Sequence, residues 1–140
     1  MSQLLVKHEA SCAAAVHLIE SFPSYNIAVH CSYYSCLQLV THILLHQEPP
    51  VAGVDRVLLN QQVRGRASHV AMTRALKSAL ETSGVSAVEA LNFTEELAQL
   101  KDKRKKAEYK DWQPTEDECR AIQVRSTALN ALLKSKFVTP

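Results

Sequence analysis

Glycine is scarce in this chain, because its 140 residues include only Gly53, Gly65 and Gly84. Proteins use about 7% glycine on average. Loops that hold a phosphate with backbone N–H groups need several glycines within a few residues. No such cluster occurs, so the sequence excludes P-loop and dinucleotide-binding functions.

The chain also lacks a charge excess and a long apolar run. Its 16 Lys and Arg against 14 Asp and Glu leave a net charge of +2, too small to indicate nucleic-acid binding without a favourable distribution. Polar residues interrupt every apolar stretch well before the ~20 residues of a membrane span. The first residues show no signal-peptide pattern. We therefore expect a cytoplasmic protein that makes no membrane contact.

A disulfide framework and a metal site are not expected either. A chain of this length buries enough surface to fold without disulfides, so its four cysteines are interpreted as small reduced hydrophobic residues. Cys-x-x-Cys pairs are absent, Cys31 and Cys36 point in different directions on a helix, and the histidines are dispersed. We expect no metal ion and no cofactor.

Apolar residues recur at spacings of three and four, and sustained alternation is absent. The pattern predicts one all-α domain over residues 1–140, a compact antiparallel bundle of four or five helices. The expected helices cover residues 4–20, 26–46 and 68–82, then a segment from about 86 into a basic stretch at 101, and a last segment from 115 to 133. Ser24 and Ser68 are expected N-caps, and Thr115 with Glu118 forms a capping box. The central helix is expected to be 26–46, because it is apolar on most sides.

The expected buried faces follow from the same spacing. They are Cys12, Val16 and Ile19; Met72, Leu76 and Leu80; Val88, Leu91, Leu97 and Leu100; and Cys119, Ile122, Leu129 and Leu133. Residues 47–67 carry Pro49, Pro50 and three arginines and are predicted to be a long loop, a type that is usually functional or mobile.

Basic residues crowd the segment 101–110. They are Lys101, Lys103, Arg104, Lys105, Lys106 and Lys110. One interpretation is a solvated helix end, where the helix dipole favours cations. The other is contact with a polyanion, because lysine charges beside a planar guanidinium suit phosphate oxygens.

Arg104 differs from its neighbours, because it follows Leu97 by seven residues and Leu100 by four and so continues the apolar stripe. A guanidinium there either extends to solvent or needs a carboxylate, an interface or a substrate. Simple up-and-down threading of the helices brings His69, His42 and His46 nearer to Arg104 than His30. His69 and His30 also have an ordinary interpretation as hydrogen-bonded core residues.

Three motifs carry a family resemblance. Residues 28–36 resemble the Tyr-Tyr helix of small bacterial and archaeal HEPN-domain proteins, and Ser68-His69-Val70 resembles the start of their next helix. Residues 104–109, Arg-Lys-Lys-Ala-Glu-Tyr, are similar to the Arg-x-x-Ala-Asp-Tyr signature of a subgroup. The motifs follow in the family's order from about His8 to Leu133.

The resemblance implies a helical bundle that commonly forms a homodimer. Many HEPN proteins are metal-independent endoribonucleases, often toxins paired with a minimal nucleotidyltransferase antitoxin or components of phage defence, whereas others only bind. Their catalytic signature is an arginine followed four to six residues later by a histidine. Arg104 matches, but those slots hold Glu108, Tyr109 and Lys110, so the histidine is missing.

RNA cleavage without a metal needs a base for the 2′-hydroxyl proton and a cation for the charge on phosphorus. The candidate catalytic residues are Arg104 as the cation, Tyr109, which is a poor base near neutral pH, and His69 if the fold brings it near. Lys101, Lys105 and Lys106 are the candidate nucleic-acid contacts. The sequence thus favours a degenerate or weak ribonuclease. A non-catalytic module that docks on a nucleotidyltransferase, and a structural bundle with a solvated basic end, are the alternatives.

Overall fold

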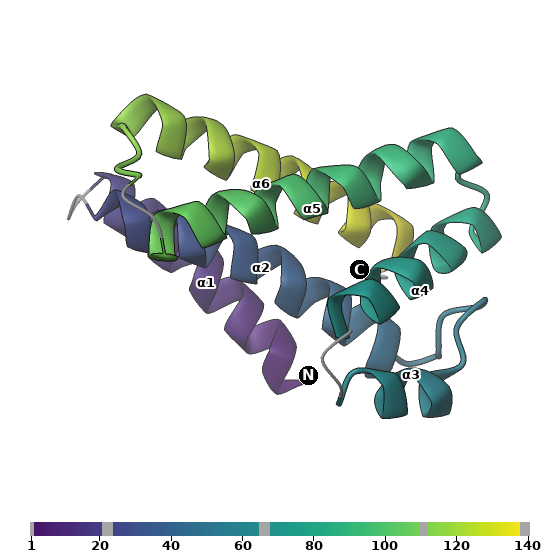
Figure 1. The fold of residues 1–140 in the computed structure, drawn as a ribbon. Helices are drawn as coiled ribbons and strands as arrows, with labels where there is room; N and C mark the ends of the chain where they lie inside the picture. Colours follow the sequence, from purple (N-terminus) through teal and green to yellow (C-terminus); the bar gives the residue numbers. More distant parts are fainter. Residues whose placement is uncertain (1, 21–23, 65–67, 110–111, 138–140) are drawn as a thin grey trace.

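The computed structural model describes residues 2–20, 24–64, 68–109 and 112–137, and these residues form six α-helices. The helices are α1 (Gln3–Glu20), α2 (Tyr25–Leu45), α3 (Arg56–Gln62), α4 (Ser68–Thr82), α5 (Ala87–Tyr109) and α6 (Glu116–Phe137). Figure 1 shows their arrangement. The all-α class is therefore confirmed, with one helix more than expected.

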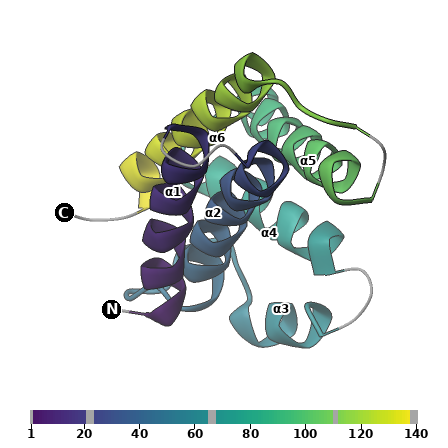
Figure 2. The ribbon, with the colours of Figure 1, turned by 90° about the vertical axis from the view of Figure 1, so that its left-hand side faces the viewer.

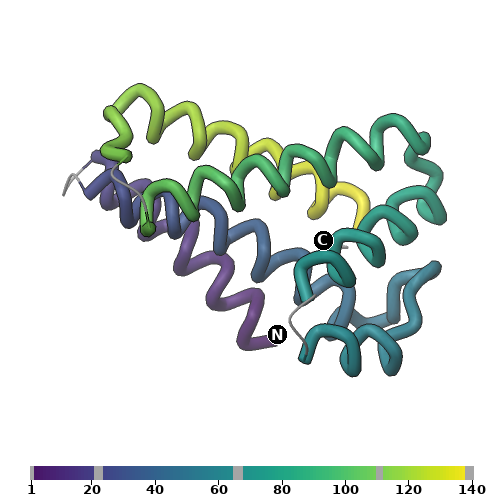
Figure 3. Tube along the Cα trace, in the orientation of Figure 1, coloured from purple at the N-terminus to yellow at the C-terminus, as the bar shows by residue number. Residues whose placement is uncertain are grey.

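Helix α2 is the centre of the bundle, as its sequence predicts, because it contacts each of the other five helices. α1 lies beside it, and α5 and α6 together cover another side of it (Figure 2). The tube in Figure 3 shows α5 and α6 running in opposite directions, with α3 and α4 at one end of the molecule. Tyr33, Cys36, Leu39 and Ile43 of α2 are at most 1% exposed, so this helix supplies much of the core.

Local sequence determines two of the helix boundaries. Thr115 Oγ1 accepts from the Glu118 N–H at 3.2 Å, and the Glu118 carboxylate accepts from the Thr115 N–H at 3.2 Å, so the predicted capping box is confirmed. At the end of α4, Gly84 has φ of +98° and its N–H donates to Glu81 O, while the Val85 N–H donates to Leu80 O. This pair of bonds is a Schellman motif, which favours glycine because of the positive φ.

The prediction of a loop over residues 47–67 is wrong in part, because α3 lies within it. Asp55 caps α3, accepting from the Leu58 N–H at 3.1 Å. Arg56 binds the Glu48 carboxylate and the backbone oxygen of Gln47, so it holds this connection together. A seven-residue helix is too short for a clear apolar period, and α3 buries only Leu59 among its residues. Arg66, one of the three arginines in the predicted loop, lies outside the described residues.

The predicted buried faces are correct for α4 and α6 and wrong in part for α1 and α5. In α1 the buried residues are His8, Ala15 and Ile19, whereas Val16 is exposed. The buried His8 donates a hydrogen bond from Nδ1 to Ser35 O at 2.7 Å. Because Ser35 lies 27 residues further along the chain, the spacing of residues within α1 does not reveal this contact. In α5, Val88 and Leu91 are exposed. The buried stripe of α5 consists of Ala90, Phe93, Thr94, Leu97, Leu100 and Ala107.

Two further observations concern the surface and the cysteines. None of the helices in the described part of the chain is long and apolar enough to cross a membrane. Cys12, Cys31, Cys36 and Cys119 are free thiols, and Cys36 and Cys119 are fully buried in the core.

Candidate functional site

Arg104 lies where α5 passes over α2, against two neighbouring tyrosines. Its guanidinium carbon is 5.4 Å from the centre of the Tyr33 ring and 5.6 Å from that of Tyr34. The Arg104 side chain is only 11% exposed. The prediction that Arg104 continues the apolar stripe is therefore confirmed, and the aromatic faces stabilise its charge in place of water.

Glu108 joins Arg104 to a histidine of another helix. Arg104 Nη1 donates to one carboxylate oxygen of Glu108 at 3.0 Å, and His30 Nδ1 donates to the other. Burial raises the pKa of the Glu108 carboxyl, but the hydrogen bond and charge of His30 and the charge of Arg104 outweigh this effect and lower it. Glu108 is thus an anion shared by two basic groups.

A second histidine reaches the same place from α4. The Tyr33 hydroxyl lies 3.1 Å from His69 Nδ1. Burial strongly raises the pKa of Tyr33, so this hydroxyl stays protonated. Burial and the charges of Lys101, Arg104 and Lys105 lower the pKa of His69, so its imidazole is neutral near pH 7.

The lysines around Arg104 fall into two groups. Lys105 and Lys106 are exposed, whereas Lys101 is half-buried, and its pKa is lowered by burial and by the charges of Lys105 and Arg104. Lys103 Nζ lies 5.4 Å from the centre of the Trp112 ring. Lys101 and Lys105 therefore lie near Arg104, and Lys105 is exposed to solvent. Lys106 is exposed too, but it follows Arg104 by two residues and so lies on the opposite face of α5.

Tyr109 is the last residue of α5 and is 76% exposed. Its exposure allows it to stack on a ligand.

The prediction that His30 lies farther from Arg104 than His42 and His46 is wrong, because His30 and Arg104 share Glu108. His42 and His46 lie at the opposite end of α2, about 18 Å or more along the helix from His30. His42 bonds to Ser2 Oγ at 2.5 Å, and His46 caps the end of α2. Simple threading placed the wrong end of α2 beside Arg104, because α5 crosses α2 at Tyr33 and Tyr34. The expectation that His69 lies near Arg104 is supported, since both contact Tyr33.

A hollow of about 390 Å³ opens beside the pair of Tyr33 and His69. Leu97 and Ala98 form part of its apolar wall, and Arg74 and Lys101 add two cations to its lining. The hollow is of the size that commonly holds small ligands or parts of larger ones.

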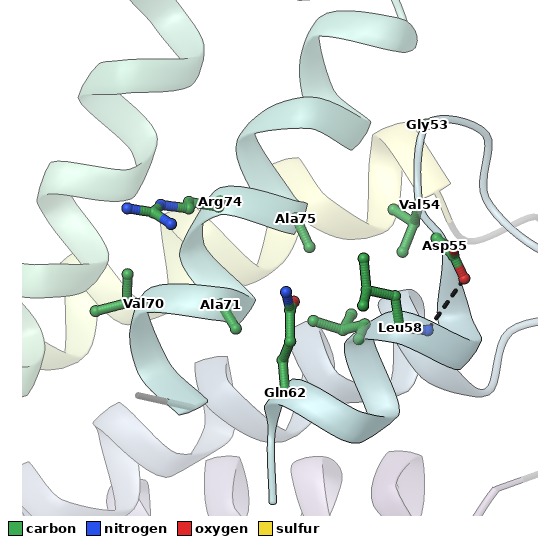
Figure 4. Close-up of a pocket in the computed structure, with 10 residues that line it drawn as sticks. Gly53, Val54, Asp55, Leu58, Gln62, Val70, Ala71, Arg74 and Ala75 are labelled. Carbon is green, nitrogen blue, oxygen red and sulfur yellow. Dashed lines mark hydrogen bonds between the residues drawn. The ribbon is translucent and has the colours of Figure 1, made fainter. Parts of the chain in front are cut away.

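A second hollow, of about 420 Å³, lies elsewhere, between α3 and α4. Figure 4 shows its lining, with the Gln62 side chain between Ala71 of α4 and Leu58 of α3, and with Arg74 pointing away from them. Its lining contains no histidine or cysteine, so it offers fewer side chains for proton transfer or nucleophilic attack than the region around Arg104.

Metal-ligating side chains do not gather in the described residues, where no group of three or more His, Cys, Asp or Glu could hold an ion. The groups at the Arg104 region instead support binding of an anion and transfer of a proton.

Sequence reasoning assigned no role to His30, Glu108, Tyr33 or Tyr34. A signal for Glu108 was available, because an acid four residues after Arg104 on a helix forms an ion pair with it. His30 comes close to Arg104 because α2 and α5 cross there. A local sequence pattern does not predict where two helices cross.

Comparisons of the chain with protein-family models, with curated proteins and with solved structures find no match.

Proposed function

We propose that this protein binds RNA through the basic C-terminal half of α5 and cleaves it slowly without a metal ion. The observation that carries the proposal is the state of Arg104. Its guanidinium is almost buried, rests on two aromatic rings and has one hydrogen-bond acceptor, Glu108, among the described residues. Because an arginine has five N–H donors in a planar fork, Arg104 retains donors for a phosphate.

The surrounding charges support an RNA ligand. Lys105 and Lys106 are exposed on the same helix, and Lys101 lies at the hollow beside Tyr33. Such cations attract a polyanion over several phosphates, and the attraction weakens as salt rises. Two histidines within the same cluster provide groups that can move the 2′-hydroxyl proton, which DNA lacks.

Glu108 explains why we expect slow cleavage. Its carboxylate already occupies part of the guanidinium where a phosphate oxygen would bind. A phosphate must either displace Glu108 or use the remaining donors of Arg104. Both alternatives reduce the free energy that is gained when RNA binds.

The family resemblance supplies the finer parts of the proposal. It implies a HEPN type of bundle and metal independence. It also implies a homodimer, a minimal nucleotidyltransferase partner and a toxin–antitoxin or phage-defence setting in the cytoplasm. These parts rest on the motifs at residues 28–36, 68–70 and 104–109.

The test is to measure RNA affinity and cleavage with EDTA present for the wild type and for Arg104→Ala. We expect the variant to bind about tenfold or more weakly, because charge-assisted hydrogen bonds contribute roughly 1.5–3 kcal/mol. Cleavage should fall about a hundredfold, since Arg104 is assigned to the charge that develops on phosphorus. Arg104→Lys should restore part of the affinity and little of the cleavage, because it keeps the charge without the fork.

The matched control is Lys136→Ala, which also removes one positive charge. Lys136 lines a hollow together with Glu89, about 22 Å along α5 from Arg104. Circular dichroism and thermal melting check that both variants fold. Equal RNA affinity of Arg104→Ala and Lys136→Ala at low salt would contradict the proposal, and wild-type binding without cleavage would reduce it to RNA binding alone.

A further inference from the structure

The two histidines near Arg104 are both hydrogen-bonded through Nδ1, one to a carboxylate and the other to a hydroxyl. His30 Nδ1 meets the Glu108 carboxylate, which can only accept. His69 Nδ1 meets the Tyr33 hydroxyl, which can donate or accept. Within the described residues this nitrogen is the one hydrogen-bond partner of the hydroxyl, so the hydroxyl proton is directed at it. The partner determines which nitrogen carries the proton of each neutral imidazole.

The consequence is that the free nitrogens of the two rings differ in function. With Nδ1–H donating to Glu108, neutral His30 has an unprotonated Nε2 that can accept a proton. With the Tyr33 hydroxyl donating to Nδ1, neutral His69 carries its proton on Nε2 and can only donate there.

The solvent exposure of His30 also favours it as the proton acceptor. The His30 side chain is 41% exposed, and its ring packs on Tyr34 at a centroid distance of 4.3 Å. Tyr34 also lies under Arg104, so His30 and the guanidinium flank one aromatic ring and share Glu108. An RNA phosphate bound at Arg104 therefore brings the neighbouring ribose close to an accessible imidazole.

We infer that His30, positioned by Glu108, is the general base that replaces the histidine missing from the HEPN motif, an inference that rests on the proposed function. Nε2 of His30 takes the proton of the 2′-hydroxyl. The 2′ oxygen forms a bond to phosphorus while the bond from phosphorus to the 5′ oxygen breaks, and the leaving oxygen takes a proton from solvent. The products are a 2′,3′-cyclic phosphate and a 5′-hydroxyl end. Glu108 touches no substrate atom in this step and acts as a positioning residue.

The first experiment measures cleavage and RNA affinity of His30→Ala. We expect the cleavage rate to fall at least about tenfold while the RNA dissociation constant stays within about twofold of wild type. Added imidazole should restore part of the lost rate, because a free base can enter the space left by the side chain. His17→Ala, which removes an exposed histidine of α1, is the control and should cleave like the wild type.

The second experiment needs no activity. Long-range ¹H–¹⁵N spectra of ¹⁵N-histidine-labelled protein, recorded above pH 8, report which ring nitrogen is protonated. We expect Nδ1–H for His30 and Nε2–H for His69. Glu108→Ala should remove the preference at His30 and leave the His69 signals unchanged.

The outcomes separate the two proposals. Cleavage that depends on Arg104 but survives His30→Ala overturns this inference alone. The same applies if His69→Ala is the variant that loses cleavage and recovers it with imidazole. An Nε2–H tautomer at His30 also overturns the inference, whereas absence of cleavage by the wild type overturns the proposed activity and the inference together.

Discussion

Single side chains set the charge balance around Arg104, and Glu108 is the most influential of them. It pairs with Arg104 four residues earlier on the same helix and with His30 on α2. The carboxylate therefore competes with any phosphate for the same guanidinium. It also holds the imidazole that we assign as the base, so we expect Glu108 both to lower the affinity for RNA and to support its cleavage.

This dual role leads to a prediction for Glu108→Gln. Removing the negative charge while keeping the shape should strengthen RNA binding by roughly threefold to tenfold, equivalent to about 0.7–1.4 kcal/mol. Fluorescence anisotropy with a short labelled RNA at low salt measures the change. Glu116→Gln is the matched control, because Glu116 forms the same kind of pair with Arg120 four residues along α6. Weaker binding by Glu108→Gln would show that the carboxylate orders the site instead of competing within it.

Among the helices, the contrast between two N-termini shows how local chemistry sets a boundary. Thr115 and Glu118 satisfy each other's backbone N–H groups at the start of α6. Ser24 occupies the corresponding position before α2, but its side chain makes no capping hydrogen bond. α2 depends instead on burial along most of its length.

We therefore expect Thr115→Ala and Ser24→Ala to differ. Thr115→Ala should lower the free energy of unfolding by about 1 kcal/mol, the usual cost of losing a capping side chain. Ser24→Ala should change it by a few tenths of a kcal/mol, within the range of surface substitutions. Urea denaturation followed by circular dichroism measures both. Equal losses in the two variants would mean that the capping box contributes no more than an ordinary serine.

The whole molecule buries several histidines, and this links its stability to pH. His8 is 0% exposed, and burial lowers its pKa; burial also lowers the pKa values of His42 and His69. Below about pH 6.5 the unfolded chain takes up protons that these three folded sites resist. The contribution of these histidines to stability is therefore present above about pH 6.5 and is lost as the pH falls below it.

The corresponding prediction is a lower urea midpoint at pH 5 than at pH 7.5, with His8→Asn reducing the difference. Asparagine can donate to Ser35 O as His8 Nδ1 does, but it does not titrate. His17→Asn controls for the loss of a histidine from α1. A His8→Asn variant with the full wild-type pH dependence would show that His8 does not contribute to the loss.

The amino-acid sequence alone was sufficient for the helical class, five of the helix positions in outline, the capping box at Thr115 and the placement of Arg104 on a buried stripe. Each of these depends on residues within about seven positions of one another, so spacing and capping chemistry reveal them. The tertiary structure decided the rest. α3, the buried His8, and the meeting of His30, Glu108 and Arg104 depend on contacts between segments as much as 78 positions apart. Such contacts depend on where the helices cross, and a local sequence pattern does not predict these crossings.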